Sequence, residues 1–235
     1  MVKPSRTNET EAREEAESAV RISAPPVVLE GSLALPARAR GVVLFAHGSG
    51  SSRLSPRNRY VAEVLHRGGI GTLLFDLLTP EEEELDERSA QLRFDIPFLA
   101  NRLIAATDWI LAQPESRLLA LGYFGASTGG GAALAAAAER PRVVAAVVSR
   151  GGRPDLAGEA LARVQAATLL IVGGEDAPVI RMNQNALREL HCKKRLKIVP
   201  GATHLFEEPG TLEAVARLAR DWFAAHFERS LQPIT

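Results

Sequence analysis

The chain has 235 residues, of which 46% are hydrophobic and 24% are charged, and this is the composition of an ordinary globular domain. Lysine and arginine number 28, as do aspartate and glutamate, so net charge does not point to nucleic acid or a membrane as a partner. No apolar run reaches the roughly 18 residues of a membrane span, and Met1–Val20 lacks the apolar core of a secretory signal. Cys192 is the only cysteine, which excludes an internal disulfide and a thiolate metal cluster. We therefore expect a cytoplasmic protein.

Strand-like and helix-like segments alternate along most of the chain. Residues 1–23 are polar and glutamate-rich, and we expect a tail there that is a loose helix or disordered. Residues 24–235 are expected to form one domain. Its expected strands are 27–35, 41–46, 70–75, 118–124, 143–148, 168–172 and 196–199. Helices are expected at 56–67, 94–111, 128–139, 156–164, 179–190 and around 212–222, with an acidic loop or short helix at 79–87.

This alternation predicts an α/β fold with a mostly parallel central sheet and helices on both faces. Folds of this kind bind their ligands beyond the carboxyl ends of the strands. Polar residues that directly follow an expected strand are therefore the candidates for chemistry.

A G-x-S-x-G motif, Gly125-Ala-Ser127-Thr-Gly129, lies between an expected strand and an expected helix. This is the context of a nucleophile elbow, in which serine sits on a strained strand-to-helix turn. The flanking glycines avoid a clash, and the helix N-terminus favours the negative charge that forms during attack. Ser127 is the candidate nucleophile, against the alternative of a Gly-rich turn with an incidental serine.

A serine hydroxyl needs a base, and five histidines could supply one. His66, His191 and His226 are expected on the surface. His47 directly follows a strand, on the loop that we expect to line an oxyanion site. His204 lies on the loop after the last strand, late in the chain, as the order Ser…Asp/Glu…His requires. We predict that His204 is the base; the alternative is a structural loop histidine.

The base needs a carboxylate that orients it. The turn Val172-Gly-Gly-Glu175-Asp176 follows a strand and lies between the serine and the histidine in the chain. We predict Asp176, with Glu175 as its rival and Asp155 as a weaker candidate. The carboxylate would hold the imidazole tautomer and stabilise the imidazolium without accepting its proton.

The loop Phe45-Ala-His47-Gly48-Ser49-Gly50 supplies flexible backbone after an early strand. We expect one oxyanion-hole N–H from this loop and one from Thr128, the residue after the nucleophile. Within the loop we favour the Ser49 amide, with Gly50 as the alternative. The loop could also merely connect strand and helix.

Together these residues resemble the α/β-hydrolase superfamily and, more narrowly, its dienelactone-hydrolase-like branch. Four motifs match in order from about residue 27 to the end of the chain: residues 47–50, residues 125–129, the turn ending at Asp176 and the Gly-Ala-Thr-His204 turn. Dienelactone hydrolases use a cysteine nucleophile, whereas this elbow holds Ser127, and Cys192 lies too far along the chain to replace it. The resemblance therefore implies a serine esterase rather than a dienelactone hydrolase in the strict sense.

Few residues separate the strands at 143–148 and 168–172, enough for one helix and for no lid domain. We infer an open site that suits small esters better than long lipids. Phe206 and His47 are the candidate substrate-binding residues, Phe206 as an apolar wall, although His47 is expected chiefly to hold its loop. Arg53 either receives a substrate carboxylate or is solvated.

The leading hypothesis is a carboxylic-ester hydrolase that acts through an acyl-enzyme on a small-molecule ester. A thioesterase, lactonase or peptidase could use the same triad, and a non-catalytic binding module is the alternative from another class. A nucleotide-binding fold is disfavoured because the Gly-rich turn lacks the lysine and the spacing of phosphate-binding motifs. We predict no metal and no cofactor, and a homodimer is compatible with such a domain.

Overall fold

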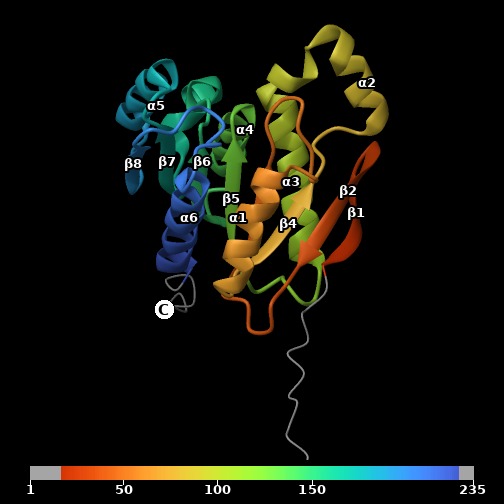
Figure 1. Cartoon of the computed structure of the whole chain (residues 1–235). Coiled ribbons are helices and arrows are strands. Elements are labelled where there is room, and N and C mark those ends of the chain that lie inside the picture. The colour runs from red at the N-terminus through yellow and green to blue at the C-terminus, as the bar shows by residue number, and fades with distance from the viewer. Residues whose placement is uncertain (1–16, 228–235) are drawn as a thin grey trace, which may run out of the picture.

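The computed structural model describes residues 17–227, which form one sheet flanked by helices (Figure 1). The strands are β1 (Ser18–Ala24), β2 (Val27–Ala34), β3 (Gly41–Ala46), β4 (Gly71–Phe75), β5 (Ala120–Ala126), β6 (Val144–Arg150), β7 (Ala167–Gly173) and β8 (Lys194–Val199). The α-helices are α1 (Pro56–Arg67), α2 (Pro80–Ser89), α3 (Ile96–Ala112), α4 (Thr128–Glu139), α5 (Ala177–Glu189) and α6 (Thr211–Phe227). Two 3₁₀ segments, η1 (Leu92–Phe94) and η2 (Pro154–Arg163), complete the elements.

The strand order is β1-β2-β4-β3-β5-β6-β7-β8. β2 runs antiparallel to β1 and β4, and all the strands numbered β3 to β8 are mutually parallel. The expected α/β fold with a mostly parallel sheet is therefore confirmed. Because parallel strands point the same way, the loops after β3, β5, β6, β7 and β8 gather at one edge of the sheet.

The central strands are apolar because both of their faces are covered. Every residue of β3 and β7 is buried, as is typical of strands in the middle of a parallel sheet. One core cluster packs α3 and α4 against one face of the sheet, and a second packs α1 and α6 against the other. These two layers make the sheet a rigid platform for the loops at its edge.

Local sequence signals set several helix boundaries. The Ser55 side chain caps α1, with Pro56 at the first helical position, as predicted. α4 spans the predicted residues 128–139. Residues 154–163, expected to be part of an α-helix, form a 3₁₀ segment instead. Gly158 at φ 52° and ψ −134° breaks the helical path there.

The structure differs from the prediction at the amino-terminal boundary. Ser18–Ala24, expected to lie almost wholly in a polar tail, is strand β1 and pairs with β2 along its whole length. Ile22 and Ala24 point into the core while their neighbours face solvent. This alternation is short and polar on one side, so the strand depends on pairing with β2 and on tertiary packing. Residues 1–16 of the expected tail lie outside the described residues.

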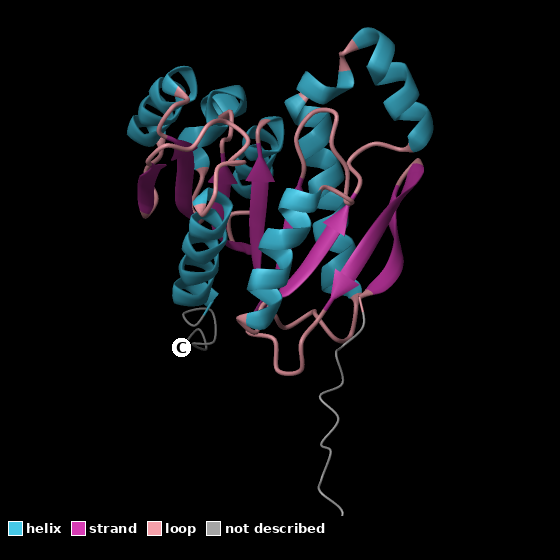
Figure 2. Ribbon diagram, viewed as in Figure 1, coloured by secondary structure: helices cyan, strands magenta, loops and turns pink. Residues whose placement is uncertain are grey.

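α2 and η1 rise beyond the carboxyl ends of the strands (Figure 2). Thr79 caps α2 through a capping box with Glu82, so the acidic run predicted as a loop or short helix is a helix of 10 residues. Between β6 and β7 the chain forms only η2, as expected for a fold without a lid domain.

Candidate active site

The turn between β5 and α4 holds Ser127 in a strained conformation. Its backbone lies at φ 51° and ψ −122°, a region that L-residues rarely adopt. The Ser127 N–H donates to the Arg150 carbonyl at 3.3 Å, and the Ser127 carbonyl accepts from the Arg153 N–H at 3.0 Å. The neighbouring strand end therefore maintains the strained turn.

Glycines around Ser127 are required by the close approach of other backbone segments. A Cβ at Gly129 would lie 2.1 Å from the Ala46 carbonyl oxygen, and a Cβ at Gly125 would lie 2.4 Å from the Gly129 oxygen. A Cβ at Gly48 would lie 3.0 Å from the Ser127 Cβ. The loop after β3 is thus packed directly against the serine, as the prediction of an elbow beside an oxyanion loop requires.

The loops after β7 and β8 bring Asp176 to His204. The His204 Nδ1–H donates to Asp176 Oδ2 at 2.7 Å, a short charge-assisted hydrogen bond. The Asp176 side chain is 12% exposed and that of His204 is 40% exposed. An imidazole held in this way keeps its proton on Nδ1 and has Nε2 free to accept one.

The other candidate carboxylates lie apart from His204. Glu175 is exposed, although its N–H donates to the Ala202 carbonyl at 2.9 Å and so ties the two loops together. Asp155 forms an ion pair with Arg153 at 2.7 Å. Among residues 17–227, Asp176 is the one of these three carboxylates that hydrogen-bonds to the histidine.

The turn after β6 contacts both the serine and the histidine, whereas the sequence drew attention to it only for Asp155, as a weak candidate carboxylate. Arg150 accepts from Ser127, and a Cβ on the following Gly151 would lie 3.5 Å from ring atoms Nδ1 and Cε1 of His204. Asn183, fully buried in α5, donates to the Gly152 carbonyl at 3.0 Å. The pair of glycines directly after a strand was the available signal.

The predicted oxyanion loop has an internal hydrogen bond. The Ser49 N–H donates to the Thr128 hydroxyl at 3.1 Å, and the two hydroxyls lie 3.1 Å apart. Ser49 would therefore have to share or release this bond to serve an oxyanion, which leaves Gly50 as an open alternative. Thr128 begins α4, where N–H groups have no acceptor within the helix.

His47 anchors this loop. Its Nδ1–H donates to the Gly48 carbonyl at 3.0 Å, and its Nε2 accepts from the Leu77 N–H at 3.0 Å. Burial lowers the pKa of His47, and the hydrogen bond to Gly48 and the charge of Asp76 only partly oppose this effect. With 8% exposure and both ring nitrogens engaged, His47 has a structural role rather than the expected contact with substrate.

Three further side chains differ from the predictions. Phe206 is 1% exposed and packs in the core on the α1 and α6 side, so it forms no substrate wall. Arg53 is 26% exposed, and its guanidinium forms ion pairs with Asp76 and Glu30 in place of the expected solvent or substrate carboxylate. His226, expected on the surface, is 8% exposed and packs against Trp222 in a tilted arrangement, with the ring centroids 4.4 Å apart.

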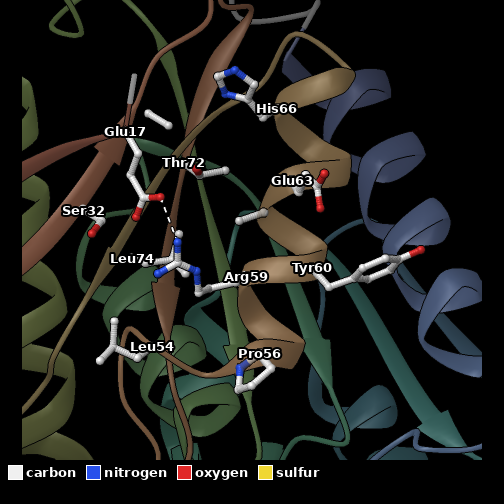
Figure 3. A pocket seen from close by; sticks show the side chains of 12 residues that line it. Glu17, Ser32, Leu54, Pro56, Arg59, Tyr60, Glu63, His66, Thr72 and Leu74 are labelled. Atoms are coloured by element: carbon white, nitrogen blue, oxygen red, sulfur yellow. Dashed lines mark hydrogen bonds and ion pairs between the residues drawn. The ribbon is translucent and has the colours of Figure 1, made fainter. Parts of the chain in front are cut away.

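Two cavities border this region of the molecule. A small one of about 20 Å³ lies between the oxyanion loop, α2 and η1, and includes Ser49, Thr128 and Glu83. A larger groove of about 570 Å³ lies between α1, β2 and β4, and the Arg59–Glu17 ion pair crosses it (Figure 3). The groove does not include Ser127, Asp176 or His204.

Among residues 17–227, no cluster of three histidine, cysteine, aspartate or glutamate side chains is arranged to hold a metal ion. In the same range no helix combines the length and apolarity that crossing a bilayer would need.

Comparison with known proteins adds relatives of two kinds. Two curated proteins from Mycobacterium tuberculosis, each named "Putative phosphoribosyl transferase", are 62% identical over 208 residues. That region is 88% of this chain but 46% of each relative, so the chain spans about half their length. Est1E from Butyrivibrio proteoclasticus is 15% identical over 89% of this chain and 99% of its own, with a TM-score of 0.72, and shows the fold alone.

A solved dienelactone hydrolase from Anabaena variabilis is 64% identical, covering 90% of this chain and 98% of its own, with a TM-score of 0.88. The model of the dienelactone hydrolase family matches residues 29–229. With the strand order and the elbow described above, these matches show that the chain belongs to the dienelactone hydrolase family of α/β-hydrolases.

Proposed function

We propose that the protein is a serine hydrolase that cleaves small carboxylic esters through an acyl-enzyme. Ser127 is the nucleophile, His204 the base and Asp176 the carboxylate that orients it. The observation that carries the proposal is the 2.7 Å hydrogen bond from His204 to Asp176, on loops at the sheet edge where Ser127 is held in a strained turn. Membership in a hydrolase family supports the same reading.

In this mechanism the Ser127 Oγ attacks the ester carbonyl carbon while its proton passes to His204 Nε2. The carbonyl oxygen becomes an oxyanion, stabilised by the Thr128 N–H and by an N–H of the loop at residues 48–50. The C–O bond then breaks, and the alcohol leaves with the proton from His204. Water attacks the acyl-enzyme by the same route and releases the acid and the free serine.

Asp176 supports both steps without taking a proton. Its carboxylate accepts from Nδ1 and so leaves Nε2 available as the proton acceptor. It also stabilises the imidazolium formed in each transition state. The proposed size of the substrate follows from the short connection between β6 and β7, which holds η2 and no lid domain.

Thioesters, lactones and peptides could react at the same three residues, because triads are shared by enzymes of many substrates. The name of the mycobacterial relatives belongs to proteins of which this chain matches 46%. A binding module without catalysis is disfavoured because it would need neither a strained serine nor a histidine oriented by a carboxylate.

The test is hydrolysis of p-nitrophenyl acetate, butyrate and octanoate by the wild type, Ser127→Ala and a control, Ser89→Ala, at the exposed end of α2. We expect turnover that falls with chain length, disappears in Ser127→Ala and persists in the control. Turnover unchanged in Ser127→Ala would refute the nucleophile. If no ester is cleaved, labelling of Ser127 by a fluorophosphonate separates a narrow specialist, which reacts, from a binding module, which does not.

A further inference from the structure

A buried arginine lies beside the candidate active site, at the end of β6. Arg150 is 7% exposed, and its Nη2 donates to Asn58 Oδ1 at a long 3.4 Å. Its Nε and Nη1 are buried and make no hydrogen bond within residues 17–227. No ion pair found in that range includes Arg150. A buried charge without a partner is strongly unfavourable, so a bound anion would stabilise this site.

A second arginine adds to the positive charge at the same place. Arg57 lies in the first turn of α1, next to Asn58, and its Nε is also buried without a hydrogen bond in the described chain. Burial, together with the positive charge of Arg57, lowers the pKa of Arg150 to about 10, so Arg150 is still charged at neutral pH. The first turn of α1 contains no acidic residue that would offset the positive end of the helix dipole.

Glu207, the only carboxylate paired with these arginines in the described residues, is 3.1 Å from Arg57 and 64% exposed. Two guanidinium groups therefore share one solvated carboxylate. The planar guanidinium group of arginine, with its fork of N–H donors, is well suited to bind phosphate and carboxylate oxygens.

We propose that Arg150 and Arg57, beside the start of α1, bind a small oxyanion, of the size of inorganic phosphate or a carboxylate group. The anion supplies the counter-charge that Arg150 lacks and accepts hydrogen bonds from its free nitrogens. Anion binding requires no hydrolysis, so it can be tested independently of the proposed esterase activity.

The proposed anion site is linked to the triad through two segments, the turn after β6 and the loop after β8. The Arg150 carbonyl accepts from the Ser127 N–H, and the next residue, Gly151, lies against the His204 ring. Glu207, which pairs with Arg57, lies on the same loop as His204. An anion that holds Arg150 and Arg57 together therefore stiffens the backbone on both sides of the histidine. The bound anion is either free phosphate or a charged group of the substrate.

The first experiment measures phosphate binding by titration calorimetry and by thermal denaturation, at constant pH and ionic strength. The proteins are the wild type, Arg150→Gln and the control Arg163→Gln, which removes an exposed arginine paired with Glu139. We expect saturable binding and a rise in Tm in the wild type and the control. Arg150→Gln should bind at least about tenfold more weakly, as expected for the loss of a hydrogen bond to a charged group.

The proposal is overturned if phosphate does not bind the wild type, or binds Arg150→Gln equally well. If Arg150→Gln does not fold, Arg57→Gln decides by the same measurement: weaker binding supports the site and unchanged binding refutes it. Comparison of p-nitrophenyl acetate with the mono-p-nitrophenyl ester of glutarate separates the sources. The site binds the substrate's own carboxylate if Arg57→Gln raises KM for the anionic ester alone and phosphate inhibits competitively. The site binds a free anion if phosphate binds without competing with the ester.

Discussion

Replacement of Asp176 by asparagine removes the negative charge from the central contact of the site while keeping the size of the side chain. The bond from His204 is 2.7 Å long, which places the two charge centres roughly 4 Å apart. At an effective dielectric constant of about 20, unit charges at that separation attract by about 4 kcal/mol. His204 is 40% exposed, so water screens part of this attraction. We expect kcat/KM to fall by about 10²- to 10³-fold, equivalent to roughly 3–4 kcal/mol of transition-state stabilisation.

The assay is steady-state hydrolysis of p-nitrophenyl acetate, with a thermal melt to show that the variant remains folded. Glu175→Gln is the matched control, because it removes the adjacent carboxylate, which is exposed, whereas His204 bonds to Asp176. Its activity should stay near that of the wild type. A fully active Asp176→Asn together with an inactive Glu175→Gln would refute the assignment of the orienting carboxylate.

Three other changes have definite expected outcomes. Gly129→Ala should lower Tm and abolish ester turnover, because its Cβ would lie 2.1 Å from the Ala46 carbonyl oxygen; a stable, active variant would contradict the proposed packing of the elbow. Phe206→Ala should reduce the free energy of unfolding in urea by about 3–5 kcal/mol, the usual effect of emptying a core site, and a loss below 1 kcal/mol would contradict its burial. Burial alone would raise the pKa of Asp86, but hydrogen bonds from the backbone and guanidinium of Arg93 hold it below its usual value. The carboxylate therefore stabilises the fold above its unfolded-state pKa of about 3.9, and this contribution is lost as the pH falls. Urea unfolding of Asp86→Asn from pH 6 to pH 3 should show a weaker acid-induced loss of stability than the wild type, and parallel curves would refute this.

Much of the fold was predictable because its signals are local. Continuous apolar runs bounded by turn residues mark strands that are buried on both faces, and α4 was predicted with its boundaries because a Gly- and Ala-rich run follows the elbow motif. β1 was missed because its alternation is short and acquires meaning only when β2 pairs with it. η2 was predicted as a helix because its apolar spacing is helical, whereas Gly158 adopts a backbone conformation that spacing does not reveal.

The residues of the candidate site were also predictable only in part. By itself the sequence determined the order of the motifs, the serine at a strand-to-helix turn and the late histidine, because each is a short pattern with its own backbone requirement. Only the tertiary structure decided that Asp176 rather than its neighbour meets His204, that Phe206 turns into the core, and that Arg150 is buried without a counter-charge. The physical reason is that side-chain direction and burial depend on backbone angles and on segments distant in the chain. Neither residue type nor spacing records these.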